Sequence, residues 1–295
     1  MSVRPGFAPA KINLFLHVGA PGDDGYHPIC SLMTFADVGD ELTASPARIM
    51  SFAADGPFAE GLGETGDNLV VRARDAMLTL APTPPPPFSL RLTKILPIAS
   101  GMGGGSADAA AALRLVRARL DPDPEDDVVS GVARALGADV TACLRSVPVL
   151  AQGRGDTLAR PPAFPGLDAV LVNPLTPTPT AEVYRAYDEA PAPNGADTPE
   201  PATPLRSATE IAAFLRGCRN DLEAAAVRLR PRIGEALGLL AAQPETMLAR
   251  MSGSGATCFA LCADAAAAAR LEARLSALAP AWWVRRTVLT GSKGL

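Results

Sequence analysis

The run LPIASGMGGGSADAAAAL combines residue types that suit the binding of an anion. It carries glycines at positions 101, 103, 104 and 105, directly before an alanine-rich stretch. Glycines let backbone N–H groups close around a phosphate, and the amino terminus of a following helix adds partial positive charge. This segment therefore predicts a phosphate-binding turn at the start of a helix.

The order of these glycines excludes two common nucleotide-binding loops. No Lys-Ser/Thr pair follows the last glycine, as a Walker loop requires, and Ser106 stands where a GxGxxG turn has its third glycine. The structural alternative is a glycine-rich connector that packs closely against a helix. The sequence Ser-Ala-Asp at the expected helix start favours the functional interpretation.

Two further stretches carry polar groups that could act on a substrate. In PAKINLFLHV, alternation along a strand places Lys11 and Asn13 on one face, although such a pair alone is more often solvated than catalytic. In LGADVTACL, Asp139 stands at an expected helix-to-loop junction, where an aspartate is typical of a turn or cap. By itself, this local hydrogen-bonding role is the favoured interpretation of Asp139.

The elements that must position these residues mix strand and helix patterns. Alternating apolar runs predict strands over residues 12–18, 41–44, 88–92, 147–151, 169–172, 258–261 and 283–289. Helical spacing predicts helices over residues 68–80 behind an Asp67 cap, 106–120, 128–136, 222–240 with Pro231 inside it, and 265–278. The expected fold class is α+β.

Proline-rich stretches interrupt this pattern at residues 82–87 and 191–204. Proline lacks a backbone N–H and breaks helices and central strands, so both stretches predict surface loops, and we expect the second to be mobile. The segment PPAFPG at residues 161–166 is expected to connect two domains.

Composition excludes several classes of function. The 295 residues are 48% hydrophobic and carry a formal net charge of −4, so the basic excess typical of nucleic-acid binding is missing. No apolar stretch reaches a bilayer span, and we expect a cytoplasmic protein without nucleic-acid or membrane partners. Its five scattered cysteines predict reduced core thiols, and two histidines do not build a zinc site.

The run PIASGMGGGSA, residues 97–107, resembles the central motif of the GHMP kinases, a family of ATP-dependent small-molecule kinases. Further segments are similar to that family in the same order: PAKINL with DGYH, LGADVTACL, TAEVYRAY, RNDLEAA and MSGSGATCFAL. The PAKINL, DGYH and TAEVY segments resemble the branch that phosphorylates the 2-hydroxyl of a cytidine-diphosphate sugar alcohol in the non-mevalonate route to isoprenoid precursors.

The resemblance implies a two-domain α+β GHMP fold with the active site in the interdomain cleft. The amino-terminal ATP-binding domain would span residues 1–157, and a carboxy-terminal domain that contributes to substrate binding would span residues 158–295. The implied cofactors are ATP and Mg2+, and Ser106 is placed to meet either a phosphate oxygen or the magnesium ion. The residues implied around the ATP phosphates are Pro97, Ser100, Gly101, Met102, Gly103, Gly104, Gly105, Ser106, Ala107, Gly253 and Gly255.

For catalysis, the resemblance places Lys11 and Asp139 together at the acceptor hydroxyl. Phosphoryl transfer needs a group that accepts the proton of this hydroxyl, and Asp139 is the candidate base. A nearby ammonium favours the ionised carboxylate and stabilises charge on the transferred oxygens. The residues implied at the cytidine substrate are Tyr26 and Tyr184, as the two faces of a base sandwich, with Asn13, His27 and Thr180.

Two positions depart from the family pattern. Tyr184 stands where phenylalanine is expected, which preserves an aromatic face, and Thr141 stands where proline is common, which leaves the chain after Asp139 less constrained. Two other functions stay open: a GHMP kinase with another acceptor, such as homoserine or mevalonate, and a catalytically silent nucleotide-binding regulator. A monomer and a homodimer are both compatible with the sequence.

Overall fold

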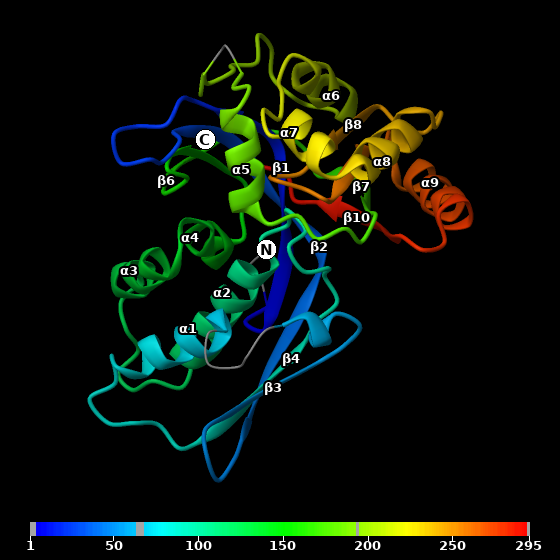
Figure 1. The fold of residues 1–295 in the computed structure, drawn as a ribbon. Helices are drawn as coiled ribbons and strands as arrows, with labels where there is room; N and C mark the ends of the chain where they lie inside the picture. Colours follow the sequence, from blue (N-terminus) through cyan, green and yellow to red (C-terminus); the bar gives the residue numbers. More distant parts are fainter. Residues whose placement is uncertain (1–3, 63–67, 193–194, 294–295) are drawn as a thin grey trace. The chain divides into compact units, whose positions relative to one another are not determined.

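The computed structural model describes residues 4–62, 68–192 and 195–293, which form two compact units (Figure 1). Within this described part, unit 1 combines residues up to 10 with residues 39–98 and 103–146, and unit 2 combines residues 11–38, 99–102 and 147 onward. Both units are therefore discontinuous in sequence, whereas the two domains expected from the sequence are contiguous.

Unit 1 places helices beside a small sheet. Its strands are the first residues of β1 (Phe7–Val18), the second half of β2 (Ile29–Pro46), β3 (Ser51–Asp55) and β4 (Phe88–Thr93). Strand β4 pairs antiparallel with β2, with Glu41 opposite Thr93, and parallel with β3. The helices are η1 (Ala59–Gly61), α1 (Leu69–Leu78), α2 (Gly104–Arg117), α3 (Asp126–Leu136) and α4 (Ala138–Arg145).

Local sequence explains where these helices begin and how they pack. Helix α1 begins after Asn68, whose side chain accepts a hydrogen bond from Val70 N at 2.9 Å, while the predicted cap Asp67 lies outside the described residues. Helix α2 buries its alanine run together with Leu113 and Val116. Alanine is the best helix former, and its small side chain allows close packing against neighbouring elements.

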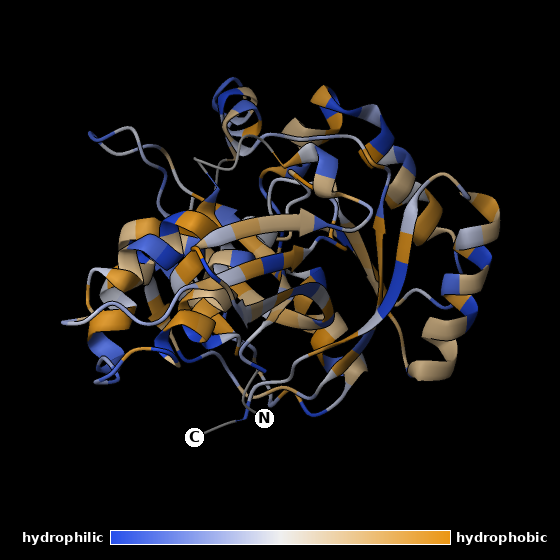
Figure 2. Ribbon diagram, turned by 90° about the horizontal axis from the view of Figure 1, so that it is seen from below, coloured by the Kyte–Doolittle hydropathy of each residue, from blue (hydrophilic) through white to orange (hydrophobic). Residues whose placement is uncertain are grey.

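Unit 2 is built on an antiparallel sheet whose strands follow the order β2-β10-β7-β9-β8. Its further strands are β5 (Val149–Gly153), β6 (Thr157–Ala159), β7 (Leu167–Asn173), β8 (Leu248–Met251), β9 (Cys258–Leu261) and β10 (Trp283–Leu289). Its helices are α5 (Thr180–Asp188), α6 (Ala208–Arg216), α7 (Glu223–Leu229), α8 (Pro231–Ala241) and α9 (Ala265–Leu278). Figure 2 shows both hydrophobic and hydrophilic residues along the helices, as expected for elements with one face on a core.

Several predicted helices and strands are confirmed, and others have wrong boundaries. Residues 265–278 and 283–289 form α9 and β10 as expected, whereas the strand expected at 41–44 is the end of the much longer β2. The single helix expected over 222–240 is two helices, because Pro231 occupies the first turn of α8. All five cysteines are buried free thiols, as predicted.

Candidate active site

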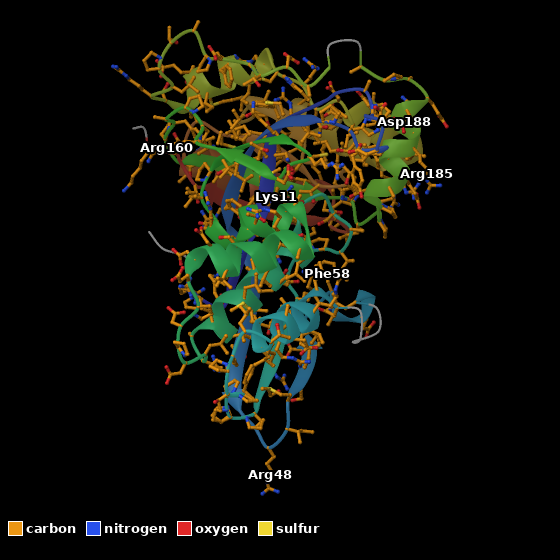
Figure 3. All side chains as sticks on the ribbon, turned by 90° about the vertical axis from the view of Figure 1, so that its left-hand side faces the viewer. Lys11, Arg48, Phe58, Arg160, Arg185 and Asp188 are labelled. Carbon is orange, nitrogen blue, oxygen red and sulfur yellow. The ribbon has the colours of Figure 1, made fainter. Side chains whose placement is uncertain are left out.

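Lys11 and Asn13 lie on one face of β1 within unit 2, as the alternation predicts, and both are buried. Lys11 Nζ donates to Asn13 Oδ1 at 3.0 Å, and Asn13 Nδ2 donates to Ser31 Oγ at 2.7 Å. Ser31 Oγ in turn donates to Phe15 O at 2.6 Å. The interpretation of Lys11 and Asn13 as solvent-exposed residues is therefore wrong. Figure 3 labels Lys11.

The first part of the glycine-rich run lies between β1 and the SGSGAT segment in unit 2. Lys11 N donates to Met102 O at 2.9 Å, and Ser252 Oγ donates to Gly101 O at 3.1 Å. Thr257 N donates to Ser100 O at 3.0 Å. The structure thus brings together three segments that are far apart in the sequence and that were each predicted to carry site residues.

The glycines at this junction are required by close backbone approach. Gly101 has φ +74°, and a Cβ atom there would stand 2.3 Å from Ser252 O. Gly253 has φ +56°, and its Cβ would stand 3.0 Å from Gly101 O. Only glycine adopts these conformations without strain and leaves room for the neighbouring backbone.

Two asparagines that the sequence analysis did not single out hold the SGSGAT segment in place. Asn220 Nδ2 donates to both Met251 O and Gly253 O at 2.8 Å, and Asn173 Nδ2 donates to Thr257 Oγ1 at 2.8 Å. Asn220 lies in the RNDLEAA segment, and the resemblance of that segment to the family could have indicated a role for it. Thr180, a predicted substrate residue, contacts the same segment, with its Oγ1 3.0 Å from Ser254 Oγ.

The second part of the glycine-rich run opens α2 in unit 1. Gly103 is left-handed with φ +62°, and no side chain caps the helix that begins at Gly104. The first N–H groups of an uncapped helix are free to bind an anion, and the helix dipole favours negative charge there. Ser106 lies in this first turn and is partly exposed. This geometry suits the predicted phosphate-binding turn.

A buried ion network behind this turn was missed by the sequence analysis. Lys94 Nζ donates to Asp40 Oδ2 at 2.5 Å and to Asp108 Oδ2 at 2.8 Å. Burial raises the pKa of Asp108 to about 7, although Lys94 opposes this rise. Burial alone would lower the pKa of Lys94, but the two carboxylates raise it above its ordinary value, so the lysine is charged.

Asp139 lies in the first turn of α4, so the helix-to-loop junction expected there is wrong. Helix α3 ends before Gly137, whose φ of +156° redirects the chain into α4. A carboxylate in a first helical turn is stabilised by the partial positive charge of the helix. Asp139 belongs to unit 1 and Lys11 to unit 2, and their pairing stays a prediction.

The predicted cytidine-binding side chains belong to unit 2 and differ in environment. Tyr26 is 61% exposed, and the guanidinium of Arg154 lies 4.4 Å from the centre of its ring. His27 lies 5.1 Å from the ring of Tyr184, and its nitrogens face Asp188 Oδ1 at 3.0 Å and Gly19 O at 2.8 Å. Both nitrogens of His27 are therefore engaged within the protein, and its side chain, only 7% exposed, also packs edge-on against the ring of Tyr187 at 5.7 Å.

The described residues contain no group of three or more His, Cys, Asp or Glu side chains that could hold a metal ion. Among the predicted site residues, Ser106 offers a hydroxyl in the first turn of α2, which could supply a single ligand to magnesium. Magnesium commonly keeps several waters and binds through nucleotide phosphates, so the residues present fit an ion that is held mainly by the nucleotide.

The described part of the proline-rich segment 191–204 contacts the rest of unit 2 through several hydrogen bonds, and its expected mobility stays a prediction. Asp197 O and Oδ1 lie 2.8 and 3.0 Å from His17 Nδ1, and Gln152 Nε2 donates to Thr198 Oγ1 at 3.0 Å. The segment lines a groove of about 580 Å3 in unit 2. None of the predicted site residues lines that groove.

Two family models match the chain. Residues 68–146 match the GHMP kinase amino-terminal domain, and residues 201–281 match the GHMP kinase carboxy-terminal region. The chain is also similar to curated proteins named 4-diphosphocytidyl-2-C-methyl-D-erythritol kinase. One from Caulobacter vibrioides (strain NA1000 / CB15N) is 54% identical over 96% of this chain and 98% of its own length, and one from Caulobacter sp. (strain K31) is 56% identical over 97% and 98%.

The chain is also similar to solved structures of kinases. A crystal structure of 4-(cytidine 5'-diphospho)-2C-methyl-D-erythritol kinase is 32% identical and covers 97% of this chain and 99% of its own, with a TM-score of 0.74. The crystal structure of L. major mevalonate kinase is 15% identical and covers all of both chains, with a TM-score of 0.66. At that identity the second likeness shows the fold alone.

Proposed function

The chain belongs to the GHMP kinases and is an ATP-dependent kinase of the two-domain α+β GHMP fold, and we propose that its acceptor is the 2-hydroxyl of 4-diphosphocytidyl-2-C-methyl-D-erythritol. The observation that carries this proposal is the 54–56% identity, over nearly the whole chain, to proteins that bear this substrate in their name. The reaction would place the chain in the non-mevalonate route of isoprenoid precursor synthesis.

The arrangement within each unit supports assigned roles. In unit 2, Asn13 holds Lys11 Nζ through a 3.0 Å hydrogen bond, and this ammonium would stabilise charge on the transferred phosphoryl oxygens. In unit 1, the uncapped start of α2 would bind the triphosphate. Asp139 would accept the proton of the acceptor hydroxyl or orient it, because phosphoryl transfer asks mainly for positioning and charge neutralisation.

The cytidine end would be recognised by aromatic faces. Tyr26 is exposed, and Tyr184 is packed against His27, so each tyrosine can offer a flat surface to a pyrimidine. Magnesium is the metal that phosphoryl transfer by this family implies, and it would neutralise charge on the phosphates. Ser106 would supply its single protein ligand.

Other expectations stay predictions. These are the domain boundary at residue 157, a cytoplasmic location, the monomer or homodimer, and the absence of nucleic-acid partners. Within the described residues, no helix combines the length and apolar character needed to cross a membrane.

The decisive experiment is an ADP-release assay with magnesium-ATP that offers the cytidine substrate, homoserine and mevalonate in parallel. We expect turnover of the cytidine substrate alone, and Asp139→Asn should lower kcat about 100- to 10,000-fold, as loss of a general base does. Asp127→Asn is the matched control, because Asp127 is an exposed aspartate in the first turn of the neighbouring α3.

Each alternative function predicts a different result in this assay. Turnover of homoserine or mevalonate instead would leave the family intact and overturn the acceptor. ATP binding without turnover of any alcohol would favour the silent regulator.

A further inference from the structure

Lys94 ties together two stretches of chain on either side of the glycine-rich run within unit 1. It directly follows β4, and its side chain is almost completely buried. Its Nζ atom bridges Asp40 on β2 and Asp108 on α2, at 2.5 and 2.8 Å. The three residues therefore connect a strand, the chain that leaves β4 and the helix that follows the glycines.

Asp40 also fixes the backbone that leads into the glycine-rich run. Its Oδ1 atom accepts hydrogen bonds from Ile95 N at 2.5 Å and Leu96 N at 2.8 Å, immediately before Pro97. On the other side, Asp108 lies in the second turn of α2. Lys94 thus sets the distance between the segment before the glycines and the helix after them.

The glycine turn rests directly on this network. A Cβ atom at Gly104 would stand 3.0 Å from Lys94 Nζ and 3.8 Å from Asp40 Oδ2. The first residue of α2 therefore packs closely on the ammonium, and a side chain at position 104 would require Lys94 to shift.

Stability alone does not explain three ionisable side chains in this place. Burying an ion pair costs desolvation energy, and replacing one by well-packed apolar residues is often neutral or stabilising. One oxygen of the network, Asp108 Oδ1, is buried without a hydrogen-bond partner in the described structure, which adds to the cost. We therefore look for a functional reason for this ion network, and the backbone geometry that it fixes is that of the glycine turn at the start of α2.

We propose that Lys94, together with Asp40 and Asp108, is a positioning residue for the nucleotide triphosphate. It would hold the first turn of α2 in the conformation that binds the phosphates, without touching the nucleotide itself. This inference rests on the proposed function, because it assigns the turn to ATP. It predicts that loosening the network weakens the binding of phosphate groups specifically.

The test compares Asp108→Asn with Asp55→Asn in the full-length enzyme. Asn at 108 keeps the size and leaves the Lys94–Asp40 pair, but replaces the ionic bond to α2 by a bond to a neutral amide. Asp55 makes an exposed ion pair with Arg91 in the same unit, so its substitution is the matched control. The readouts are KM for ATP, KM for the alcohol substrate, kcat, and the inhibition constants of inorganic triphosphate and adenosine.

For Asp108→Asn we expect KM for ATP and the inhibition constant of inorganic triphosphate to rise about tenfold, which is the effect of losing roughly 1.4 kcal/mol. The KM for the alcohol and the inhibition constant of adenosine should change less than about twofold, a difference within the usual effect of a surface substitution. Asp55→Asn should leave all values unchanged.

A purely structural network would lower the melting temperature or the active fraction of Asp108→Asn and leave both phosphate-dependent constants unchanged, which would overturn the inference. If Asp108→Asn does not fold, the triple variant Asp40→Asn/Lys94→Met/Asp108→Leu removes all three charges together, and the amide oxygen at position 40 can still accept from Ile95 N and Leu96 N. The same phosphate-specific loss is expected there. Absence of turnover in the wild-type enzyme would count against the proposed function instead.

Discussion

Single side chains at this site divide into those whose role shows in local sequence and those whose role depends on the fold. Lys11 and Asn13 are two residues apart on a strand, so alternation alone predicts their shared face. Lys94 is separated from Asp40 by 54 residues and from Asp108 by 14, and no spacing rule links them. Their pairing arises only when β2, β4 and α2 pack together, which is why it could not be predicted from the sequence.

The contribution of the Lys11 ammonium to catalysis can be tested by a single substitution. Replacing Lys11 by Met keeps the length of the side chain but removes the ammonium, and we expect kcat to fall at least about 100-fold if that charge stabilises the transition state. Lys293→Met is the matched control, because Lys293 is an exposed lysine of the same chain. Equal kcat values for the two variants would exclude a catalytic role for Lys11.

The cysteines give a residue-scale prediction about pH. Burial raises the pKa of Cys218 to about 11 and that of Cys262 to about 12, and the thiolate is the reactive form. All five thiols are buried. Native enzyme should therefore react negligibly with a thiol reagent between about pH 7 and 9, a range below these raised values. Denatured enzyme should react at all five, and rapid labelling of native protein near pH 8 would contradict the prediction.

At the scale of elements, apolar periodicity located most strands and helices but not their ends. Helix α9 and strand β10 agree with the prediction because each has one strong period and clear boundaries. The expected single helix over 222–240 is interrupted before Pro231, because proline is compatible with the first turn of a helix but not with its interior. Helix α4 was missed because it has only eight residues and directly follows α3.

Two glycines of the glycine-rich run should differ in how much their replacement by alanine lowers the stability of the protein. Gly101→Ala should destabilise the protein by about 1 to 3 kcal/mol, because a non-glycine residue is strained at φ +74° and its Cβ would overlap Ser252 O. Gly105→Ala should be tolerated, since the added Cβ would lie 3.8 Å from Leu69 Cδ1 at a helix start. Denaturant unfolding measures both, and similar free energies of unfolding for the two variants would refute the close approach.

At the scale of the whole molecule, the order of motifs predicted the family, but not the composition of the compact units. The sequence suggested one contiguous boundary near residue 157, whereas β1 and β2 each contribute residues to both units. Long strands of this kind carry no composition change at the point where they leave one unit. The boundary is set by tertiary contacts between distant segments, which hydrophobic periodicity does not encode.

The contacts of Asp197 lead to a prediction about how the proline-rich segment is held against the rest of unit 2. Asp197 pairs with His17 and with Arg219, and the hydrogen bond from Arg219 lowers the pKa of Asp197 below its ordinary value. An aspartate with a lowered pKa contributes stability above its unfolded pKa and loses that contribution as the pH falls through the folded value. The segment should therefore stay anchored throughout the neutral range.

Asp197→Ala removes the two side-chain ion pairs, with His17 and Arg219, and leaves the contact between His17 Nδ1 and the backbone O of residue 197. Loss of these two pairs should release the segment to a protease at pH 7, with cleavage within residues 195–204 at least about tenfold faster than in the wild type, as expected when opening costs roughly 1.4 kcal/mol less. Glu200→Ala is the control, because Glu200 is an exposed carboxylate of the same segment. Mass spectrometry of a timed digest locates the cuts. Cleavage at equal rates in both variants would mean that proline content, rather than the bonds of Asp197, holds this segment in place.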